Sequence, residues 1–257
     1  MGLWKLCLWM EKYMSLKLLG ATDCGEVIEN PTFKSTNRGD EKLIKVTDWI
    51  KPEDMNSDEK VLKHPIFEQA FSEILKKWKP RSNVAFLSLC TATRPYSKSQ
   101  KYAEFIRRFG EHVDFIVVSN GGFIPPAYWS SFPFLNYDAM HDDTGAWDYL
   151  YQTTMYHRIL RFFSTFKYEY VIANFRPSLR NHRPARIGLK KMKKEGKIKD
   201  YVIIPEQELY DRAAADGWRG GNGAGAMFPD LHLFVISALD EQVKKWSNYQ
   251  DPTDSLF

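Results

Sequence analysis

The chain has 257 residues, of which 44% are hydrophobic, 26% charged and 15% aromatic, so it resembles an average globular protein and is not a disordered or low-complexity chain. Three cysteines without a Cys-x-x-Cys pair exclude a disulfide-stapled miniprotein and a four-cysteine zinc site, and favour a reducing compartment. The net charge is only +4, so the distribution of charge along the chain, rather than its total, must indicate partners.

Residues 1–60 mix short apolar pieces with turn signals, which predicts an N-terminal extension before a domain over residues 61–257. The apolar run at the start is interrupted at Lys5 and Glu11, which favours an amphipathic packing segment over a signal peptide. No uninterrupted apolar run reaches the length of about 18 residues that a membrane span needs. We therefore expect no membrane partner and a cytoplasmic protein, in the host cytoplasm if the source is viral.

From residue 64 onward, stretches with helical spacing of apolar residues alternate with short apolar runs typical of buried strands. Helices are predicted at 65–79, 102–109, 149–166 and 187–197, and strands at 84–89, 115–118, 170–173 and 201–205. This alternation predicts an α/β fold of three layers, with a mainly parallel sheet flanked by helices. Ligands of such sheets bind beyond the carboxyl ends of the strands, which points to loops 90–99, 119–126 and 174–184 and to the segment after Pro205.

The first of these loops is a dense cluster of polar and reactive residues. Cys90 is a candidate nucleophile if Arg94 lowers its pKa, and Arg94 is also able to clamp a carboxylate or a phosphate at two points. Tyr96 is a candidate for stacking on a base. The alternative is that Cys90 is a buried small hydrophobe and Arg94 an ordinary surface residue.

The pattern C-x3-[K/R]-P-Y-x2-S, formed by Cys90, Arg94, Pro95, Tyr96 and Ser99, resembles the signature of the archaeosine synthase family, relatives of archaeal tRNA-guanine transglycosylase. In that family the signature reads P-C-x3-K-P-Y-x2-S-x2-H. Upstream, a family helix that begins with His-Pro is matched; downstream, the family segments T-S-P-x-G-x-x-P-R, Y-P, H-Y-D and T-G-x-W-D are matched in order. The resemblance covers about residues 62–175.

The resemblance implies a fold similar to uracil-DNA-glycosylase and the attachment of an amino acid, lysine in the family, to the nitrile of a 7-deazaguanine base in tRNA. The implied catalytic residues are Cys90, Arg94, Tyr96, Ser99, Asp138 and Asp148. The implied substrate contacts are Ser119, Asn120, Gly121, Gly122, Tyr137 and Trp147. The two aspartates are candidates for orienting the amine or accepting its proton, and Asp148 has the alternative role of capping the helix that follows it.

Three positions depart from the family signature. Its leading proline is Leu89, its lysine is Arg94 and its final histidine is Tyr102. Loss of a histidine that titrates near neutral pH puts a proton-relay role at this position in doubt. The chain is also shorter than the larger family proteins, which carry a transglycosylase barrel and an RNA-binding module, so a separate protein that inserts or delivers the base is an expected partner.

Basic residues concentrate in the segment 176–199. Ten lysines and arginines stand there against Glu195 alone, a net charge of +9, so the rest of the chain carries −5. Such segregation favours binding of phosphates in a nucleic acid. The predicted nucleic-acid contacts are Arg176, Arg180, Arg183, Arg186, Lys190 and Lys191. The alternative is a solvated, lysine-rich helix face.

No cofactor is expected. The glycine-rich segment 217–226 lacks the Gly-Lys-Ser/Thr of a phosphate-binding loop, and the six histidines are dispersed without metal-ligand spacing. Together these features predict an enzyme that transfers an amino acid or a similar amine to a hypermodified base in tRNA or DNA. The alternatives are a non-catalytic nucleic-acid-binding module of the same fold and a base-excising enzyme of glycosylase type.

Overall fold

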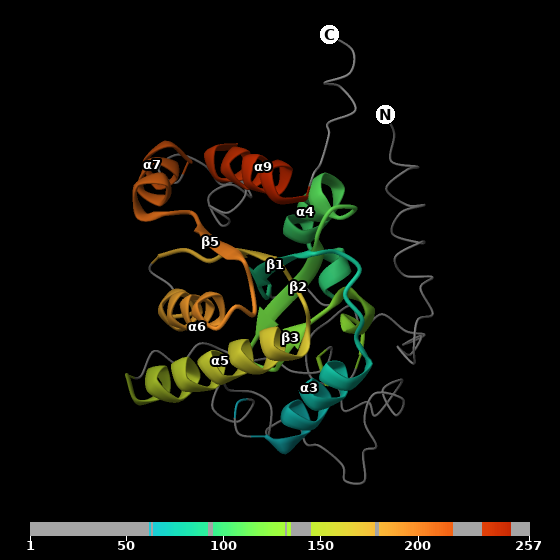
Figure 1. Ribbon diagram of the computed structural model, residues 1–257. Helices are drawn as coiled ribbons and strands as arrows, with labels where there is room; N and C mark the ends of the chain where they lie inside the picture. Colours follow the sequence, from blue (N-terminus) through green and yellow to red (C-terminus); the bar gives the residue numbers. More distant parts are fainter. Residues whose placement is uncertain are drawn as a thin grey trace. The chain divides into compact units, whose positions relative to one another are not determined.

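The computed structural model describes residue 62 and residues 64–91, 95–131, 133–134, 145–177, 180–217 and 233–247 (Figure 1). The predicted extension, residues 1–60, lies outside the described residues. The glycine-rich segment falls almost wholly outside them as well.

Five strands form one sheet in the order β3-β2-β1-β4-β5. They are β1 (Val84–Leu89), β2 (Asp114–Ser119), β3 (Gly122–Ile124), β4 (Tyr170–Asn174) and β5 (Asp200–Ile204). Strand β4 pairs in parallel with both β1 and β5, whereas β3 pairs antiparallel with β2. The predicted mainly parallel sheet is thus confirmed, and β3, which was not predicted, completes one edge.

Six helices accompany these strands in the described part of the chain. They are α3 (Pro65–Lys77), α4 (Gln100–Phe109), α5 (Gly145–Thr165), α6 (His182–Lys194), α7 (Gln207–Gly217) and α9 (Leu233–Ser247), with short 3-10 turns η2 (Tyr96–Lys98) and η3 (Pro126–Tyr128). All four predicted helices are present, but three begin earlier than predicted. Asp148 therefore lies inside the first turn of α5, and its predicted role as the residue capping that helix is wrong.

Helix α6 begins five residues before the predicted start at residue 187. Pro184 favoured a loop there, but proline is tolerated in the first turn of a helix, where the backbone N–H groups have no partner within the helix. As a result, Arg183 and Arg186 project from a helix and not from a loop.

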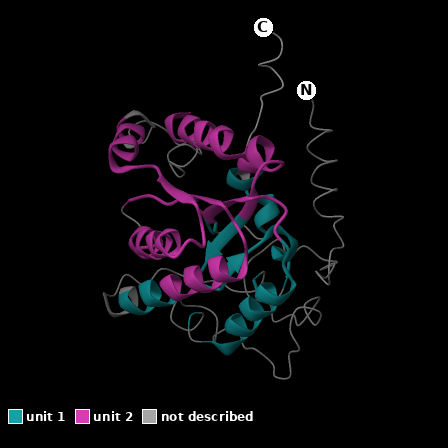
Figure 2. Cartoon of the chain, in the orientation of Figure 1, with its two compact units in different colours: residues 1–79, 89–103, 116–154 teal, residues 80–88, 104–115, 155–257 magenta. Residues whose placement is uncertain are grey.

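The chain divides into two compact units (Figure 2). Unit 1 comprises residues 1–79, 89–103 and 116–154, and unit 2 comprises residues 80–88, 104–115 and 155–257. The boundaries fall within β1, β2, α4 and α5, so each unit holds part of the sheet.

In unit 1, α3 packs on β3 through its aromatic face. A Cβ atom added at Gly121 would lie 2.9 Å from Cδ1 of Phe67, and Gly122 has a positive φ of 141°. The turn between β2 and β3 therefore requires glycine for two separate reasons, close approach of a neighbour at one position and backbone conformation at the next.

In unit 2, aromatic side chains of β1 and β4 pack on the same face of the sheet. Phe86 of β1 stacks on Phe115 at a ring-centroid distance of 4.7 Å and also contacts the rings of α4. Tyr170 of β4 lies two residues before Ile172, the register partner of Phe86. Its ring stacks on Trp246 of α9 at a centroid distance of 5.0 Å. Helix α6 covers the opposite side of β5 from α7 and α9 (Figure 1).

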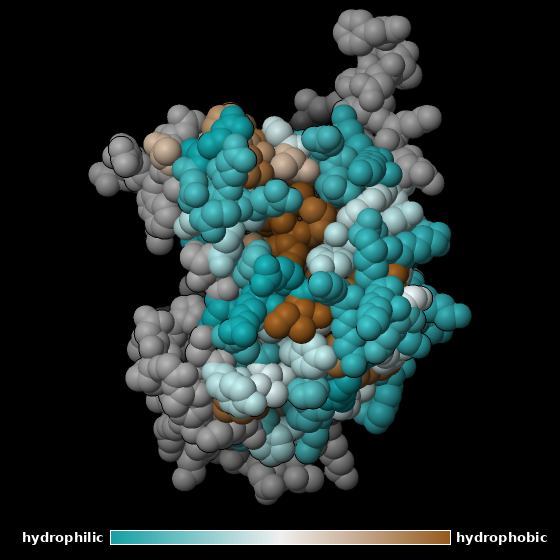
Figure 3. Space-filling model, turned by 60° about the vertical axis from the view of Figure 1, so that its left-hand side comes forward, coloured by the Kyte–Doolittle hydropathy of each residue, from teal (hydrophilic) through white to brown (hydrophobic). Residues whose placement is uncertain are grey.

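Hydrophilic side chains predominate on the face of the molecule drawn in Figure 3, and hydrophobic side chains show between them. Large hydrophobic side chains that are exposed in the described ranges are Tyr149, Ile187, Leu233 and Phe234. Among the helices described, none is long and apolar enough to span a membrane.

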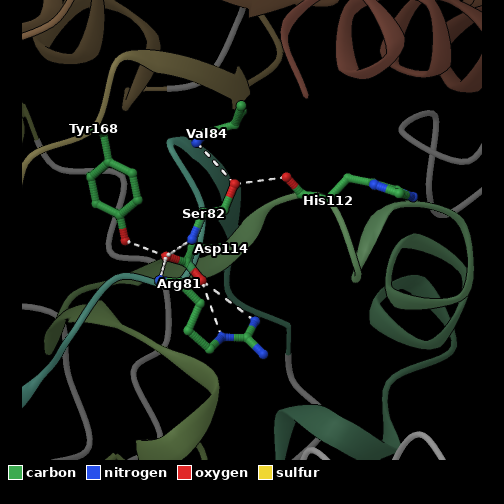
Figure 4. Close-up of polar contacts among 6 residues, drawn as sticks. All are labelled: Arg81, Ser82, Val84, His112, Asp114 and Tyr168. Carbon is green, nitrogen blue, oxygen red and sulfur yellow. Dashed lines mark hydrogen bonds and ion pairs between the residues drawn. The ribbon is translucent and has the colours of Figure 1, made fainter. Parts of the chain in front are cut away.

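A buried carboxylate fixes the entry to β1 (Figure 4). Asp114, fully buried at the start of β2, accepts hydrogen bonds from the backbone N–H groups of Arg81 and Ser82 at 2.8 and 3.3 Å and from the Tyr168 hydroxyl at 3.1 Å. Its other oxygen pairs with the Arg81 guanidinium at 3.4 Å. The Ser82 hydroxyl in turn donates to the carbonyl of His112 at 2.7 Å. These contacts connect the segment before β1 to β2 and to Tyr168, two residues before β4.

We expect Asp114→Ala to lower the free energy of unfolding by about 3 kcal/mol, because it leaves several buried donors without an acceptor. Asp200→Ala, which removes a carboxylate paired with Lys193 at the surface, serves as control and is expected to cost less than about 1 kcal/mol. Urea denaturation measures both. Equal losses in the two variants would contradict the structural role of Asp114.

The same site predicts a pH dependence. Burial is the largest influence on the Asp114 carboxyl and raises its pKa, against the opposing effects of Arg81, Ser82 and Tyr168. Because the folded state then holds the proton more tightly than the unfolded state, the contribution of Asp114 to stability is greatest at low pH and is lost as pH rises through the raised pKa. The stability of the wild type relative to Asp114→Asn should fall as the pH rises above about 4, the ordinary pKa of an aspartate. A rise over that range would contradict the direction of the shift.

Candidate functional site

Cys90 directly follows β1 and is half-buried. Its backbone N–H donates to the carbonyl of Val118 in β2 at 2.9 Å. This bond fixes the backbone of Cys90 one residue away from the predicted substrate contact Ser119. This partial exposure contradicts the alternative interpretation, in which Cys90 is a buried small hydrophobic residue.

The remaining described motif residues build a compact turn into α4. Pro95 and Tyr96 are buried, and Pro95 accepts a backbone hydrogen bond from Lys98 at 3.0 Å. The N–H of Ser99 donates to the Tyr96 carbonyl at 3.1 Å, and the Ser99 carbonyl accepts from Ala103 at 2.8 Å. Pro95, Tyr96 and Ser99 thus shape the segment between the thiol and α4.

Three aromatic side chains of unit 1 form a buried cluster next to this turn. The Tyr96 ring contacts Tyr102 and Trp129 at centroid distances of 5.9 and 6.3 Å, nearly edge-on in both cases. Tyr102 and Trp129 lie 5.5 Å apart, and the Trp129 Nε1–H donates to the Ile124 carbonyl at 3.0 Å. Tyr96 is fully buried, so its ring packs inside the protein and does not face solvent as a platform for a base.

Tyr102, at the position of the family histidine, is buried as well, and its hydroxyl donates a hydrogen bond to the carbonyl of Leu89. This bond joins α4 to the last residue of β1, directly before Cys90. The neighbouring Lys101 is only 3% exposed, with its ammonium 5.8 Å from the Tyr102 ring centroid. Lys101 was not predicted as a site residue, because a lysine in an amphipathic sequence gives no sign of burial.

The predicted substrate contacts Ser119, Asn120, Gly121 and Gly122 form the turn from β2 to β3 and are all buried. The Ser119 hydroxyl accepts a hydrogen bond from the Gly121 N–H at 3.0 Å. Together with Cys90, these residues meet at the end of β2.

The other predicted residues of this site have no described side chains. Arg94, Tyr137 and Asp138 lie outside the described residues, and the side chains of Trp147 and Asp148 are outside them too, although both positions belong to α5. The roles predicted for these five residues remain predictions.

Unit 2 contributes a polar pair that was not predicted. Ser88 and Asn174 are register partners at the carboxyl ends of β1 and β4 and are 0% and 1% exposed. Within the described part of the chain, the Ser88 hydroxyl and both polar atoms of the Asn174 amide have no hydrogen-bond partner. Buried polar groups without partners cost about 1–3 kcal/mol each, and in native proteins they are normally satisfied by water or a ligand. Only their position at the ends of predicted strands indicated these residues in the sequence.

The predicted nucleic-acid contacts fall into two sets, both in unit 2. Arg176 and Arg180 are half-buried in the segment between β4 and α6, whereas Arg183, Arg186, Lys190 and Lys191 are exposed on α6. Burial lowers the pKa of His182 at the start of α6, and the positive charge of Arg186 lowers it further. Among the described residues, no group of three His, Cys, Asp or Glu side chains could hold a metal ion.

Residues 67–191 match the family described as "Domain of unknown function (DUF5591)". The chain is also similar to the structure entitled "Crystal structure of AF0587, a protein of unknown function", with 15% sequence identity and a TM-score of 0.44 over 70% of this chain. It spans half the length of that protein. No curated protein matches the sequence.

The tie between α4 and β1 can be tested with Tyr102→Phe, made in a chain whose other two cysteines, Cys7 and Cys24, are serine. Loss of the hydrogen bond to Leu89 should cost about 1 kcal/mol of stability and increase the rate at which an aromatic disulfide reagent reacts with Cys90. Tyr128→Phe, in the same unit, is the matched control and should change neither quantity appreciably. Identical thiol reactivity in all three proteins would show that Tyr102 does not position Cys90.

Proposed function

We propose that this chain is a transferase that joins an amino acid or a similar amine to a 7-deazaguanine or another hypermodified base in tRNA or DNA. The observation that carries the proposal is the placement of Cys90. It is half-buried, directly follows a parallel strand, and begins the C-x3-[K/R]-P-Y-x2-S pattern. The carboxyl ends of such strands are where α/β proteins bind their ligands.

The chemistry requires no oxidant and no leaving group from the base. In the proposed first step, the Cys90 thiolate adds to the nitrile carbon of the base, the nitrile nitrogen takes up a proton, and a thioimidate forms. The amine then attacks the same carbon and loses a proton, the carbon–sulfur bond breaks, and the thiol is restored with an amidine as product. Arg94 is proposed to favour the thiolate or to hold the carboxylate of the amino acid.

Within unit 2, Ser88 and Asn174 are proposed to recognise a base of the nucleic acid. The Asn174 amide offers one donor and one acceptor side by side, and the Ser88 hydroxyl adds a third group at the same strand ends. A purine-like base presents a complementary edge of carbonyl and N–H groups. The absence of other partners for these atoms in the described part of the chain supports this role.

A second candidate is a nucleic-acid-binding module without catalysis. The observation that favours it is Tyr102, which stands where the family has a titratable histidine and whose hydroxyl is engaged with the Leu89 carbonyl. A phenol held in this way cannot replace a histidine that gives and takes protons near neutral pH.

Mass spectrometry of nucleosides from a host that expresses the chain distinguishes these functions. We expect a new nucleoside whose added mass equals that of an amino acid or amine, and its loss on Cys90→Ala, since the carbon–sulfur bond can no longer form. The Cys7→Ser/Cys24→Ser double variant is the control and should retain the product. Unchanged product in Cys90→Ala overturns the role of the thiol; no product from the wild type, with nucleic-acid binding retained, favours the module; and release of free base indicates a glycosylase.

Removal of the buried polar pair is expected to lower the transfer activity without lowering the stability. In the Ser88→Ala/Asn174→Leu double variant, apolar side chains replace polar atoms without partners, so the free energy of unfolding should stay equal or rise by about 1 kcal/mol. The same variant should lose at least about 10-fold in transfer activity, because a bidentate contact to a base contributes about 1–3 kcal/mol. Urea denaturation and the nucleoside assay measure the two effects. A large loss of stability would identify the pair as structural and contradict its role in base recognition.

A further inference from the structure

The outward face of α6 carries a row of basic side chains that the structure separates from the other basic residues of the segment. Helix α6 buries Pro184, Ala185, Gly188, Leu189 and Met192. At about 100° per residue, the opposite side of the helix carries Arg183, Lys190 and Lys194 within about 20° of one line, with Arg186 beside them. We call these four residues, all exposed, the α6 stripe.

Ion pairing distinguishes the stripe from three lysines on its flanks. Lys191 pairs with Glu195 at 3.4 Å, Lys193 with Asp200 at 2.7 Å and Lys199 with Glu169 at 2.8 Å. None of the four stripe residues has an acidic partner among the residues that the structure describes. The charge that remains available to a partner molecule therefore lies along the middle of the exposed face.

From these observations we propose that the α6 stripe binds the phosphodiester backbone of a polynucleotide. This rests on the proposed function, whose target base has to arrive as part of a nucleic acid. The stripe extends eleven residues, about 16 Å at 1.5 Å per residue, with a charge on nearly every turn. That length corresponds to roughly five phosphates along one strand of a duplex.

The geometry of the stripe fits a linear polyanion better than other anions. A single phosphate requires side chains that converge on one point, whereas these project in parallel from successive turns. A membrane surface requires apolar residues on the same face, and Ile187 is the one large apolar side chain exposed on α6, since the other apolar residues of the helix are buried.

The direction of α6 relates the stripe to the proposed base site within unit 2. Because α6 follows β4 and leads into the parallel strand β5, its first turn lies toward the carboxyl ends of these strands and its last turn toward their amino ends. Arg183 is therefore at the end near Asn174, and Lys194 is at the far end. A strand whose target base is held at Asn174 would have its neighbouring backbone along α6.

Two triple variants that remove the same charge test the stripe. Arg183→Gln/Lys190→Gln/Lys194→Gln neutralises the stripe, and Lys76→Gln/Lys193→Gln/Lys199→Gln neutralises only lysines that are already ion-paired and were not predicted to contact nucleic acid. Binding is measured by fluorescence anisotropy on an unmodified tRNA transcript and on a DNA duplex of similar length, each at several salt concentrations. Polyglutamate at equal charge concentration is the competitor that tests for an acidic polypeptide.

We expect the stripe variant to bind roughly 100-fold more weakly near 0.1 M salt, and the slope of log K against log salt to fall in magnitude by about 2.7, which is three contacts at 0.9 each. The paired-lysine variant should stay close to the wild type, and the relative affinities of the two probes identify RNA or DNA. Equal losses in both variants, absence of binding by the wild type, or displacement by polyglutamate would each overturn the proposal.

The outcome is separable from that of the transferase proposal. A stripe-dependent affinity without any gain of mass on a base supports the stripe and overturns the transferase. A gain of mass that Cys90→Ala abolishes, with binding that does not depend on the stripe, supports the transferase and overturns the stripe.

Discussion

The parallel pairing of β1 with β4 is the constraint on which the rest of the structure depends. These strands are 80 or more residues apart in the chain, and their register from Val84–Tyr170 to Ser88–Asn174 sets what meets at each end of the sheet. At the amino end, the buried Asp114 carboxylate holds the entry to β1. At the carboxyl end, two polar side chains come together and the chain continues into Cys90. One pairing therefore separates the end of the sheet that Asp114 holds from the end at which Ser88 and Asn174 lie and from which the chain continues into Cys90.

Much of this arrangement could be predicted from the sequence, because apolar periodicity reports local structure. The helix with Phe67 and Phe71 and the strand with Phe86 have patterns that no other element would satisfy. Strand β3 has only three residues, too few for a pattern, and the basic, proline-containing start of α6 has the composition of a loop. Burial of single polar residues depends on distant parts of the chain, so neither the Ser88–Asn174 pair nor the buried Lys101 could be foreseen.

The charge of the basic segment illustrates the same limit. A count along the chain gives a net charge of +9 and treats all ten basic residues alike. Two of the acids that pair with lysines there, Glu169 and Asp200, precede or follow the segment, and their contacts exist only after β4 and β5 have paired. Tertiary structure thus reduces a broad basic segment to a narrow row. For the motif around Cys90, folding has a comparable effect: Tyr96 and Ser99 are buried, and Cys90 is half-buried.

The contact between α5 and α6 has a consequence for how the basic row meets a partner. A Cβ atom at Gly188 would lie 2.8 Å from Cγ2 of Ile159, so the two helices touch without space for one additional methyl group. The row is consequently carried on a closely packed helix, so we expect binding to expend free energy mainly on ordering the side chains. A larger residue at position 188 would require a smaller one at position 159.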